Sequence, residues 1–219
     1  MGSRLREVAP ASYGLKHWLF NLMLLAGLVF SMQAQAKDYV VVAFGTSLSH
    51  GFGLPEAEIF PVQLQKALAA KGLAVTVQNA GVSGDTTAGG LARLDWALGD
   101  PATPPDLVIV EFGGNDALRA LSPQEAEANL DQILTRLQAR HIKVLFTGMK
   151  APPNLGSDYV AAFDAIYPRL AQKHGVPFYP FFLDGVAADP ALNQADGIHP
   201  NAKGVAIIVG HLAPSSSIS

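Results

Sequence analysis

The chain has 219 residues, a length that fits a single globular domain, and 49% of its residues are apolar. Its formal net charge is −3 and its basic residues form no cluster, which argues against a nucleic-acid-binding protein. The absence of cysteine excludes disulfides and thiolate chemistry.

The first 36 residues have the pattern of a secretory signal peptide. Basic residues precede an apolar stretch at 18–32, which is shorter than the ~20 residues that a membrane-spanning helix needs. Ala34-Gln35-Ala36 then offers a cleavage site of the small-x-small type. We expect a signal peptide at 1–36, cleaved near Ala36, and one domain at 37–219 that is periplasmic or secreted from a bacterium. An uncleaved membrane anchor is the alternative.

The rest of the chain alternates short apolar runs with segments of helical periodicity. Ser122 and Pro123 form a typical helix start, and Pro168 predicts a kink or a break in one helix. The apolar runs predict strands at 39–44, 73–77, 107–112, 142–147 and 176–179. The helical spacing predicts helices at 60–71, 86–98, 123–140, 158–174 and 201–212.

This alternation predicts a parallel sheet covered on both faces, because strand–helix–strand units connect with one handedness. We therefore expect an α/β fold: a flavodoxin-like three-layer α/β/α sandwich with a five-stranded parallel sheet in the order 2-1-3-4-5. The carboxyl ends of the first three strands then meet at one edge, where open α/β sheets bind ligands. Those ends carry Ser47, the loop at 81–84 and residues 113–116.

Ser47 is a candidate nucleophile. It follows the first predicted strand, and Gly45 permits a sharp turn that would expose the serine on a rigid support. A serine hydroxyl is a poor nucleophile at neutral pH, so it needs a base that is itself oriented by a partner. A simple turn or a helix N-cap is the alternative interpretation.

His199 is the best candidate for the base, because a turn at Gly197 can fold the Asp196 carboxylate onto its Nδ1 and leave the other nitrogen for Ser47. Pro200 suits the first position of a helix, so the alternative is that Asp196 is a helix N-cap and His199 a surface residue. The other histidines of the domain fit other places. His141 and His174 fit the ends of helices, and His211 fits a position near a polar tail. His50, close to the candidate nucleophile, fits the edge of a substrate site.

Three N–H groups could stabilise a developing oxyanion. Asn115 follows two glycines at the end of a buried strand, where its side chain can donate, and the backbone N–H groups of Gly84 and Ser47 could complete the hole. A plain turn is the alternative for the Gly-Gly-Asn segment. Asp85 and Asp116 are expected to hydrogen-bond loop amides in a structural role.

Taken together, these segments resemble the SGNH (GDSL) hydrolase family over nearly the whole domain. The similarity is closest to the bacterial branch that holds thioesterase I/lysophospholipase L1 and arylesterases, which the segment 147–154 also resembles. The four ordered blocks that carry the resemblance are Phe44–Ser49, Asn79–Thr87, Glu111–Asp116 and Asp196–Pro200.

The resemblance implies a secreted serine esterase that works through an acyl-enzyme on Ser47, with His199 as base and Asp196 as its orienting partner. Ser47, Gly84 and Asn115 would form the oxyanion hole, and no metal or cofactor is implied. The implied substrates are small molecules: carboxylic esters with aryl or short-to-medium acyl groups, acyl thioesters and lysophospholipids. A carbohydrate acetylesterase of the same family and a non-catalytic binding module with this fold are the alternatives.

The chain departs from the family pattern in two places. Thr46 stands where the family has Asp before the nucleophile. A hydroxyl accepts fewer hydrogen bonds than a carboxylate, so we expect reduced activity and a gain from Thr46→Asp, unless the surroundings have adapted to Thr. The chain also ends soon after the last predicted helix, so weaker packing behind His199 is expected.

Overall fold

The computed structural model describes residues 38–213. The expected signal peptide with its cleavage site and the end of the chain after Ala213 lie outside the described residues. Five parallel strands form one sheet in the order β2-β1-β3-β4-β5, which confirms the predicted topology. The strands are β1 Tyr39–Gly45, β2 Val75–Gly81, β3 Leu107–Glu111, β4 Lys143–Thr147 and β5 Phe178–Tyr179.

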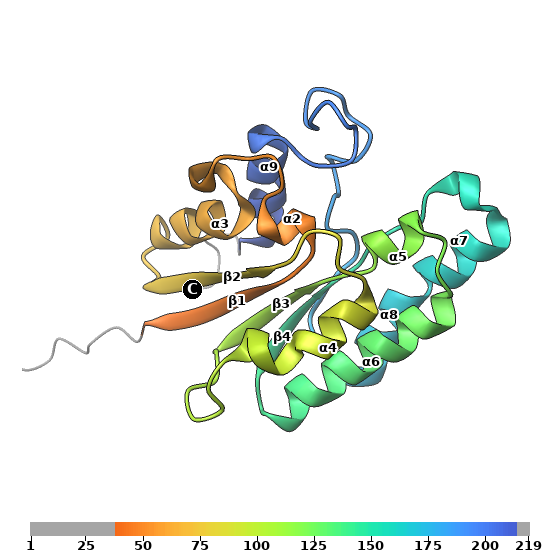
Figure 1. The fold of residues 1–219 in the computed structure, drawn as a ribbon. Coiled ribbons are helices and arrows are strands. Elements are labelled where there is room, and N and C mark those ends of the chain that lie inside the picture. The colour runs from red at the N-terminus through yellow and green to blue at the C-terminus, as the bar shows by residue number, and fades with distance from the viewer. Residues whose placement is uncertain (1–37, 214–219) are drawn as a thin grey trace, which may run out of the picture. The chain divides into compact units, whose positions relative to one another are not determined.

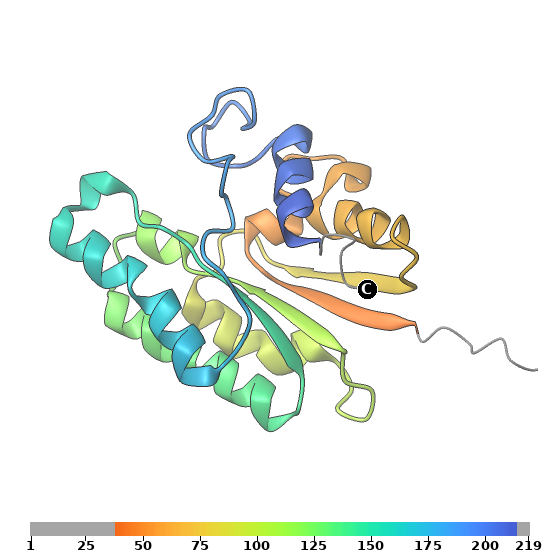
Figure 2. The ribbon, with the colours of Figure 1, turned by 180° about the vertical axis from the view of Figure 1, so that it is seen from behind.

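Helices cover both faces of this sheet (Figure 1). The helices α3 and α9 contact each other on one face, and α4, α6 and α8 lie on the other, as the view from behind also shows (Figure 2). Within residues 38–213, no helix is both long enough and apolar enough to cross a bilayer. The helices are α2 Ser47–His50, α3 Phe60–Ala69, α4 Thr87–Leu98, α5 Gly114–Leu118, α6 Pro123–Ala139, α7 Ser157–Asp164, α8 Ile166–His174 and α9 Ala202–Leu212.

The α6 helix shows how the sequence pattern builds this layered core. Ser122 caps it, its hydroxyl accepting a hydrogen bond from the backbone N–H of Glu125, and Pro123 occupies the first turn. Burying a leucine or isoleucine side chain contributes about 1.5–3 kcal/mol, so the apolar face of α6 fixes the helix against the sheet. The fully buried side chains of this face are Leu130, Ile133, Leu134 and Leu137.

The second strand is displaced from its predicted position. We expected a strand at 73–77, but β2 runs from Val75 to Gly81. Its pairing with β1 continues in register to Gly45 and Gly81, so the backbone ladder extends across Gln78 and Asn79 in spite of their polarity. These polar side chains are tolerated because β2 is an edge strand and both of them are exposed.

The predicted helix at 158–174 is broken into α7 and α8 at Ala165. Pro168 explains the break, because its ring clashes with the carbonyl of the residue four positions earlier, Asp164, where α7 ends. The short helices α2 and α5 were not predicted as helices with these bounds. Both follow directly on the strands that end at the site, and both are too short for periodicity to reveal.

The register of the sheet brings the ends of β2, β1 and β3 level with one another. Gly45 at the end of β1 pairs with Gly81 of β2 on one side and with Glu111 of β3 on the other. The residues that follow each strand therefore emerge at the same edge, as the topology predicts.

Candidate active site

The turn after β1 presents Ser47 as the first residue of α2. Thr46 is the N-cap of this helix, and its hydroxyl accepts a hydrogen bond from the backbone N–H of Leu48 at 3.5 Å. A Cβ at Gly45 would lie 2.3 Å from the Ser49 hydroxyl and 2.4 Å from a Glu111 carboxylate oxygen, so only glycine fits there. The close packing fixes the turn that holds Ser47.

Glu111, at the end of β3, is fully buried beneath this turn. Its Oε2 accepts hydrogen bonds from the backbone N–H groups of Thr46 at 2.9 Å and Ser49 at 3.2 Å, and from the Ser49 hydroxyl at 2.9 Å. The Thr46 hydroxyl donates to Oε1 at 3.0 Å. Burial raises the pKa of Glu111 from 4.5 to about 7, against the opposing effect of these hydrogen bonds.

The sequence patterns assigned Glu111 no role of its own, although one signal was present. A carboxylate that closes the apolar run 107–110 must either be buried with partners or break the strand. Its partners come from a segment more than 60 residues away, which local sequence cannot indicate. The Thr46 hydroxyl, which replaces the family's Asp, is one of those partners.

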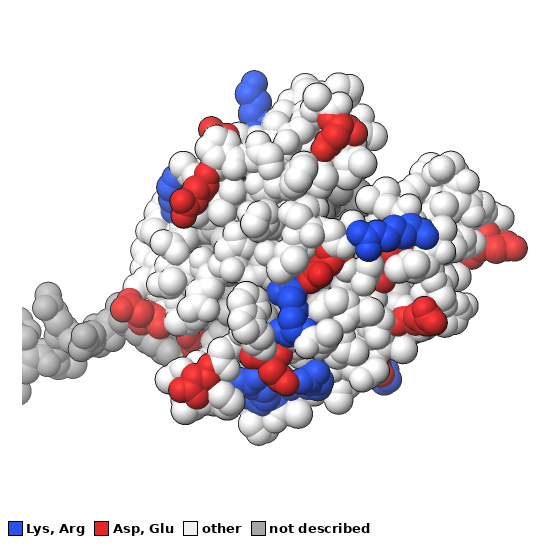
Figure 3. Space-filling view, viewed as in Figure 1, with Lys and Arg blue, Asp and Glu red and all other residues white. Residues whose placement is uncertain are grey.

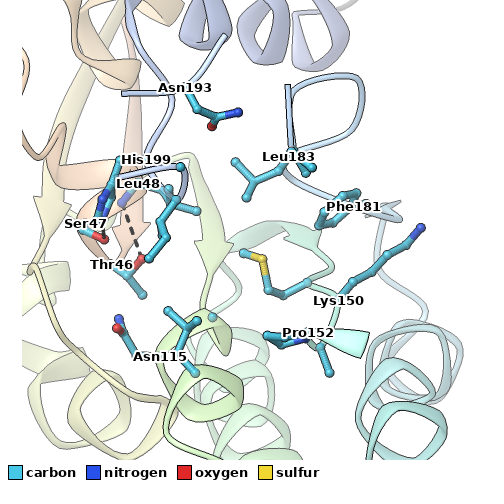
Figure 4. Close-up of a pocket in the computed structure, with 18 of the residues that line it drawn as sticks. Thr46, Ser47, Leu48, Asn115, Lys150, Pro152, Phe181, Leu183, Asn193 and His199 are labelled. Carbon is cyan, nitrogen blue, oxygen red and sulfur yellow. Dashed lines mark hydrogen bonds between the residues drawn. The ribbon is translucent and has the colours of Figure 1, made fainter. Parts of the chain in front are cut away.

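Ser47, His199 and Asp196 are brought together, although the serine and the histidine are 152 positions apart. The His199 Nε2 lies 2.9 Å from the Ser47 Oγ, a hydrogen bond drawn in Figure 4, and its Nδ1 lies 2.7 Å from the Asp196 Oδ2. The ring of Phe52 packs against the imidazole, with the ring centres 4.6 Å apart. The imidazole ring is therefore held between the Asp196 carboxylate and the Ser47 hydroxyl, and the Phe52 ring packs against it.

The Asp196 carboxylate is anchored within its own turn. Its Oδ1 accepts hydrogen bonds from the backbone N–H groups of Ile198 at 2.9 Å and His199 at 3.0 Å, across a turn where Gly197 has a φ of 69°. The backbone and side-chain hydrogen bonds of His199, followed by the Ile198 N–H, lower the pKa of Asp196 to about 2. Asp196 is therefore a carboxylate throughout the neutral and mildly acidic range.

The helix after this turn begins later than expected. We considered Asp196 as a helix N-cap and Pro200 as the first helical residue, but α9 begins at Ala202 and its N-cap is Asn201. The Asn201 side chain accepts hydrogen bonds from the backbone N–H groups of Lys203 and Gly204. The Asp196 side chain thus serves its own turn and the imidazole instead of the helix.

The three candidate oxyanion donors lie on three adjoining segments. Asn115 is the second residue of α5, and its Nδ2 donates to the backbone carbonyl of Asp85 at 2.8 Å. An amide nitrogen carries two N–H groups, so one can hold Asp85 while the second serves a substrate oxygen. Gly84 precedes Asp85, and Arg119 donates to the Gly84 carbonyl at 2.9 Å.

Two neighbouring acidic residues were expected to hydrogen-bond loop amides. Asp116 instead binds the start of α4, since it accepts from the backbone N–H of Thr87 at 2.9 Å and from the Thr87 hydroxyl at 2.7 Å. Burial raises its pKa. The Asp85 carboxylate is paired with the guanidinium of Arg93 at 2.5 Å. Arg93 was not singled out by the sequence patterns.

A cavity of about 430 Å³ opens beside the Ser47 hydroxyl. In Figure 4, Ser47, His199 and Asn115 lie at one end of it, and Lys150, Pro152 and Phe181 line the opposite wall. The Lys150 ammonium lies 4.9 Å from the centre of the Phe181 ring, at the edge of the cavity. Most of the lining is apolar, including Leu48, Leu118, Met149, Pro152, Pro153, Leu183, Ala187 and Ile198.

The remaining histidines of the described chain lie apart from the candidate site. His50 is exposed at the end of α2 and does not line the cavity, which gives no support to a role at the substrate edge. His174 contacts Asp131 and Gln138, and His211 contacts Tyr179. His141 is exposed in the turn after α6.

Ionisable side chains are dispersed over the part of the chain that the structure describes. Between residues 38 and 213, His, Asp and Glu side chains form no group of three or more that could hold a metal ion. On the face shown in Figure 3, acidic and basic side chains are interspersed among broad uncharged areas without a continuous basic patch.

Comparison with known proteins assigns the family. Residues 43–207 match the GDSL-like Lipase/Acylhydrolase family. The chain belongs to this family. It is 42% identical over 176 residues to Esterase TesA of Pseudomonas aeruginosa, a match that covers 80% of this chain and 86% of that protein.

Other relatives of this GDSL-family chain carry related names. It is 40% identical over 184 residues to Thioesterase 1/protease 1/lysophospholipase L1 of Escherichia coli K12, covering 84% of this chain and 85% of that protein. The crystal structure of AlinE4, an SGNH-hydrolase family esterase, superposes with a TM-score of 0.72 at 49% identity over 81% of this chain and 94% of that one. The chain is therefore an SGNH hydrolase that cleaves ester bonds, as the sequence patterns predict.

Proposed function

We propose that Ser47, His199 and Asp196 form the catalytic triad of this esterase and that catalysis proceeds through an acyl-enzyme on Ser47. The single observation that carries the proposal is the unbroken chain of hydrogen bonds from Asp196 through His199 to the Ser47 Oγ, at 2.7 and 2.9 Å. These distances lie within the reach that proton transfer requires.

The first half of the reaction acylates Ser47. Its Oγ attacks the carbonyl carbon of the ester while the His199 Nε2 takes the hydroxyl proton, and the carbonyl electrons move to the oxygen. The oxyanion accepts hydrogen bonds from the Ser47 and Gly84 backbone N–H groups and the Asn115 side chain. When the carbonyl re-forms, the bond to the leaving group breaks, and His199 returns the proton to that oxygen or sulfur.

Water completes the reaction. His199 takes a proton from the water, whose oxygen attacks the acyl carbon, and the collapse of the second tetrahedral intermediate releases the carboxylic acid and restores the Ser47 hydroxyl. Asp196 holds the imidazole with its Nδ1 protonated and stabilises the imidazolium that forms in each step.

The cavity supports apolar acyl or aryl substrates. Its volume of about 430 Å³ lies toward the small end of ligand pockets, and its walls beside Ser47 are largely hydrocarbon. We infer carboxylic esters with aryl or short-to-medium acyl groups, together with acyl thioesters and lysophospholipids, as the substrate class. A carbohydrate acetylesterase needs polar groups to bind a sugar, which this lining offers only sparsely. The hydrogen-bonded triad argues against a binding module without activity.

We also propose that the enzyme acts in the periplasm or outside the cell, after cleavage of a signal peptide near Ala36. The sequence pattern of residues 1–36 is the support for this proposal. The mass of the mature protein, measured after expression of the full chain in a bacterial host, tests it: an N-terminus at Met1 would contradict it.

Turnover by wild type and Ser47→Ala tests the catalytic proposal. The panel consists of p-nitrophenyl esters of graded acyl length, an acyl-CoA and a lysophospholipid. We expect Ser47→Ala to lose nearly all turnover of every substrate while it keeps the fold, since the serine and its base act as a unit. An active-serine phosphonylating reagent should add one adduct to the wild type and none to the variant. Substantial activity in a folded Ser47→Ala preparation would contradict the assignment.

A further inference from the structure

Arg93 of α4 lies beneath the candidate oxyanion hole and bonds to several of its segments at once. Its Nη2 donates to the Gly45 carbonyl and its Nη1 to the Ala80 carbonyl, both at 2.8 Å. Its Nε donates to the Asp85 Oδ2 at 2.5 Å. Only 16% of the side chain is exposed, so water competes little for these hydrogen bonds.

Each group that Arg93 contacts belongs to a segment that carries a proposed oxyanion donor. Gly45 precedes Ser47 by two residues, and Asp85 directly follows Gly84. The guanidinium carbon also lies 4.8 Å from the ring centre of Phe44 and 5.7 Å from that of Phe112, which leads into the turn before Asn115. One planar cation therefore touches the nucleophile, glycine and asparagine segments together.

Asp85 extends this connection to the side chain of Asn115. Its carboxylate pairs with Arg93, while its backbone carbonyl accepts a hydrogen bond from the Asn115 Nδ2 at 2.8 Å. The Asp85 carbonyl thus fixes the Asn115 amide and with it the direction of the second N–H group. Asp85 is itself anchored by Arg93. A continuous path of polar contacts leads from Gly45, next to the nucleophile turn, to the amide of Asn115.

We propose that Arg93, acting with Asp85, is a positioning residue that holds the three oxyanion donors of Ser47, Gly84 and Asn115 in their mutual geometry. The inference rests on the proposed function. Three donors on three separate segments stabilise one oxygen only if the segments keep fixed distances, and a misplacement of ~1 Å can cost about 10² in rate. Arginine suits the task because its rigid planar fork holds donors on three nitrogens in fixed directions, whereas the three donors of lysine share one freely rotating nitrogen.

The test compares Arg93→Lys and Arg93→Met with wild type by steady-state kinetics on a p-nitrophenyl ester, at concentrations set by active-site titration. We expect kcat to fall by roughly 10- to 100-fold in both variants, with KM changed by less than about threefold, because the loss falls on the transition state. An unchanged kcat per titrated site in Arg93→Met would overturn the inference. Asp85→Asn should lower kcat in the same pattern and serves where Arg93→Met does not fold.

Arg136 provides a matched control on the neighbouring helix. Its guanidinium donates to the Leu91 carbonyl of the same α4 helix and pairs with the Asp95 carboxylate, but it contacts no segment of the site. Arg136→Met removes the contacts of a comparable arginine with α4 but none with the site, so it should leave kcat unchanged. If it lowered kcat as much as Arg93→Met does, the effect of Arg93 would reflect the stability of α4 alone, and the inference would fail.

A double-mutant cycle distinguishes a positioning role from a merely structural one, because it measures whether the effect of Arg93→Met on kcat depends on Asn115. If Arg93 acts by placing the donors, then Arg93→Met should cost much less in kcat when Asn115 is already alanine, because one of the donors that it places is gone. Inhibition by a boronic acid, whose adduct with Ser47 is tetrahedral, should weaken in parallel with kcat/KM. Strictly multiplicative losses in kcat and an unaltered boronic acid affinity would each count against the inference.

The test of the positioning role of Arg93 can fail independently of the test of the proposed function. If Ser47→Ala kept its activity, the acyl-enzyme mechanism would fail whatever Arg93 does. If Ser47→Ala is inactive and the Arg93 variants turn over at the wild-type rate, only the positioning role fails.

Discussion

Asn115 and Asp196 each have one chemical role in the proposed site, and a small number of hydrogen bonds orients the side chain of each. The Asn115 side chain is fixed by the Asp85 carbonyl, and the Asp196 carboxylate by two backbone N–H groups and the His199 ring. Because each group is oriented before substrate arrives, its loss should change the rate more than the binding.

Replacing Asn115 by alanine removes one preorganised donor. We expect kcat to fall by about 10²–10³, equivalent to ~2.7–4 kcal/mol of transition-state stabilisation, with little change in KM. Steady-state kinetics on a p-nitrophenyl ester measure this. A rise in KM at constant kcat would instead assign Asn115 to substrate binding.

Replacing Asp196 by asparagine keeps the size of the side chain but lets its amide face the imidazole and favour the wrong tautomer. We expect a sharp fall in kcat at neutral pH. Because the pKa of Asp196 is lowered to about 2, the wild-type carboxylate stays ionised across the mildly acidic range. The ratio of wild-type to variant kcat should therefore not shrink toward 1 between pH 5 and 7. Equal rates at neutral pH would leave Asp196 with only a turn-stabilising role.

At the scale of elements, the turn from β1 into α2 is held from below by the end of β3. Glu111 accepts the N–H groups of Thr46 and Ser49 and both of their hydroxyls, so a carboxylate already serves the turn without an Asp at position 46. The structure thus favours the interpretation that the surroundings have adapted to Thr46. The expectation of a gain from Thr46→Asp is reversed.

Thr46→Asp would place a second carboxylate against the buried Glu111. Two carboxylates in one site cannot easily both ionise, and a buried charge without a partner is costly. We expect Tm and kcat both to fall, and the loss of Tm to be greater at pH 8 than at pH 5. Thr46→Ser, which keeps the hydroxyl, is the control and should stay close to wild type. A higher kcat for Thr46→Asp would restore the view that Thr46 weakens the site.

For the whole molecule, burial of Glu111 couples folding to pH. Its pKa is 4.5 in the unfolded reference and about 7 in the fold, so the folded state binds the proton more tightly. A carboxyl group with a raised pKa contributes stability that is fully present below pH 4.5 and is lost as pH rises toward 7. A shift of this size corresponds to about 3 kcal/mol.

Glu111→Gln should remove this contribution while its carbonyl still accepts the backbone N–H groups of the turn. Urea unfolding at several pH values measures the free energy of unfolding of both proteins. We expect the wild type, relative to the variant, to lose about 3 kcal/mol between pH 4.5 and pH 7. Asp116, whose pKa burial also raises, is present in both proteins and cancels in the difference. A difference that stays constant with pH would show that Glu111 does not titrate in this range.

Much of the fold could be predicted from the sequence because its determinants are local. The apolar runs of β1, β3 and β4 and the capped, periodic α6 give each element its type, and alternation of the elements gives the strand order. The limits of β2 could not be predicted, because its last residues are polar and owe their conformation to pairing with β1. Likewise, α2 and α5 are single turns set by the strands that they follow.

The sequence by itself determined the family and the chemical groups of the candidate site, because Ser47, Gly84, Asn115 and the Asp196–His199 turn stand in ordered motifs at strand ends. Only the tertiary structure decided what lies under those groups. Glu111 and Arg93 sit in a strand and a helix whose local patterns would be the same without their polar contacts. The hydrogen-bond partners of Glu111 lie 62–65 positions away in the sequence, and those of Arg93 lie 8–48 positions away. These partners reach the two side chains only after the sheet has formed.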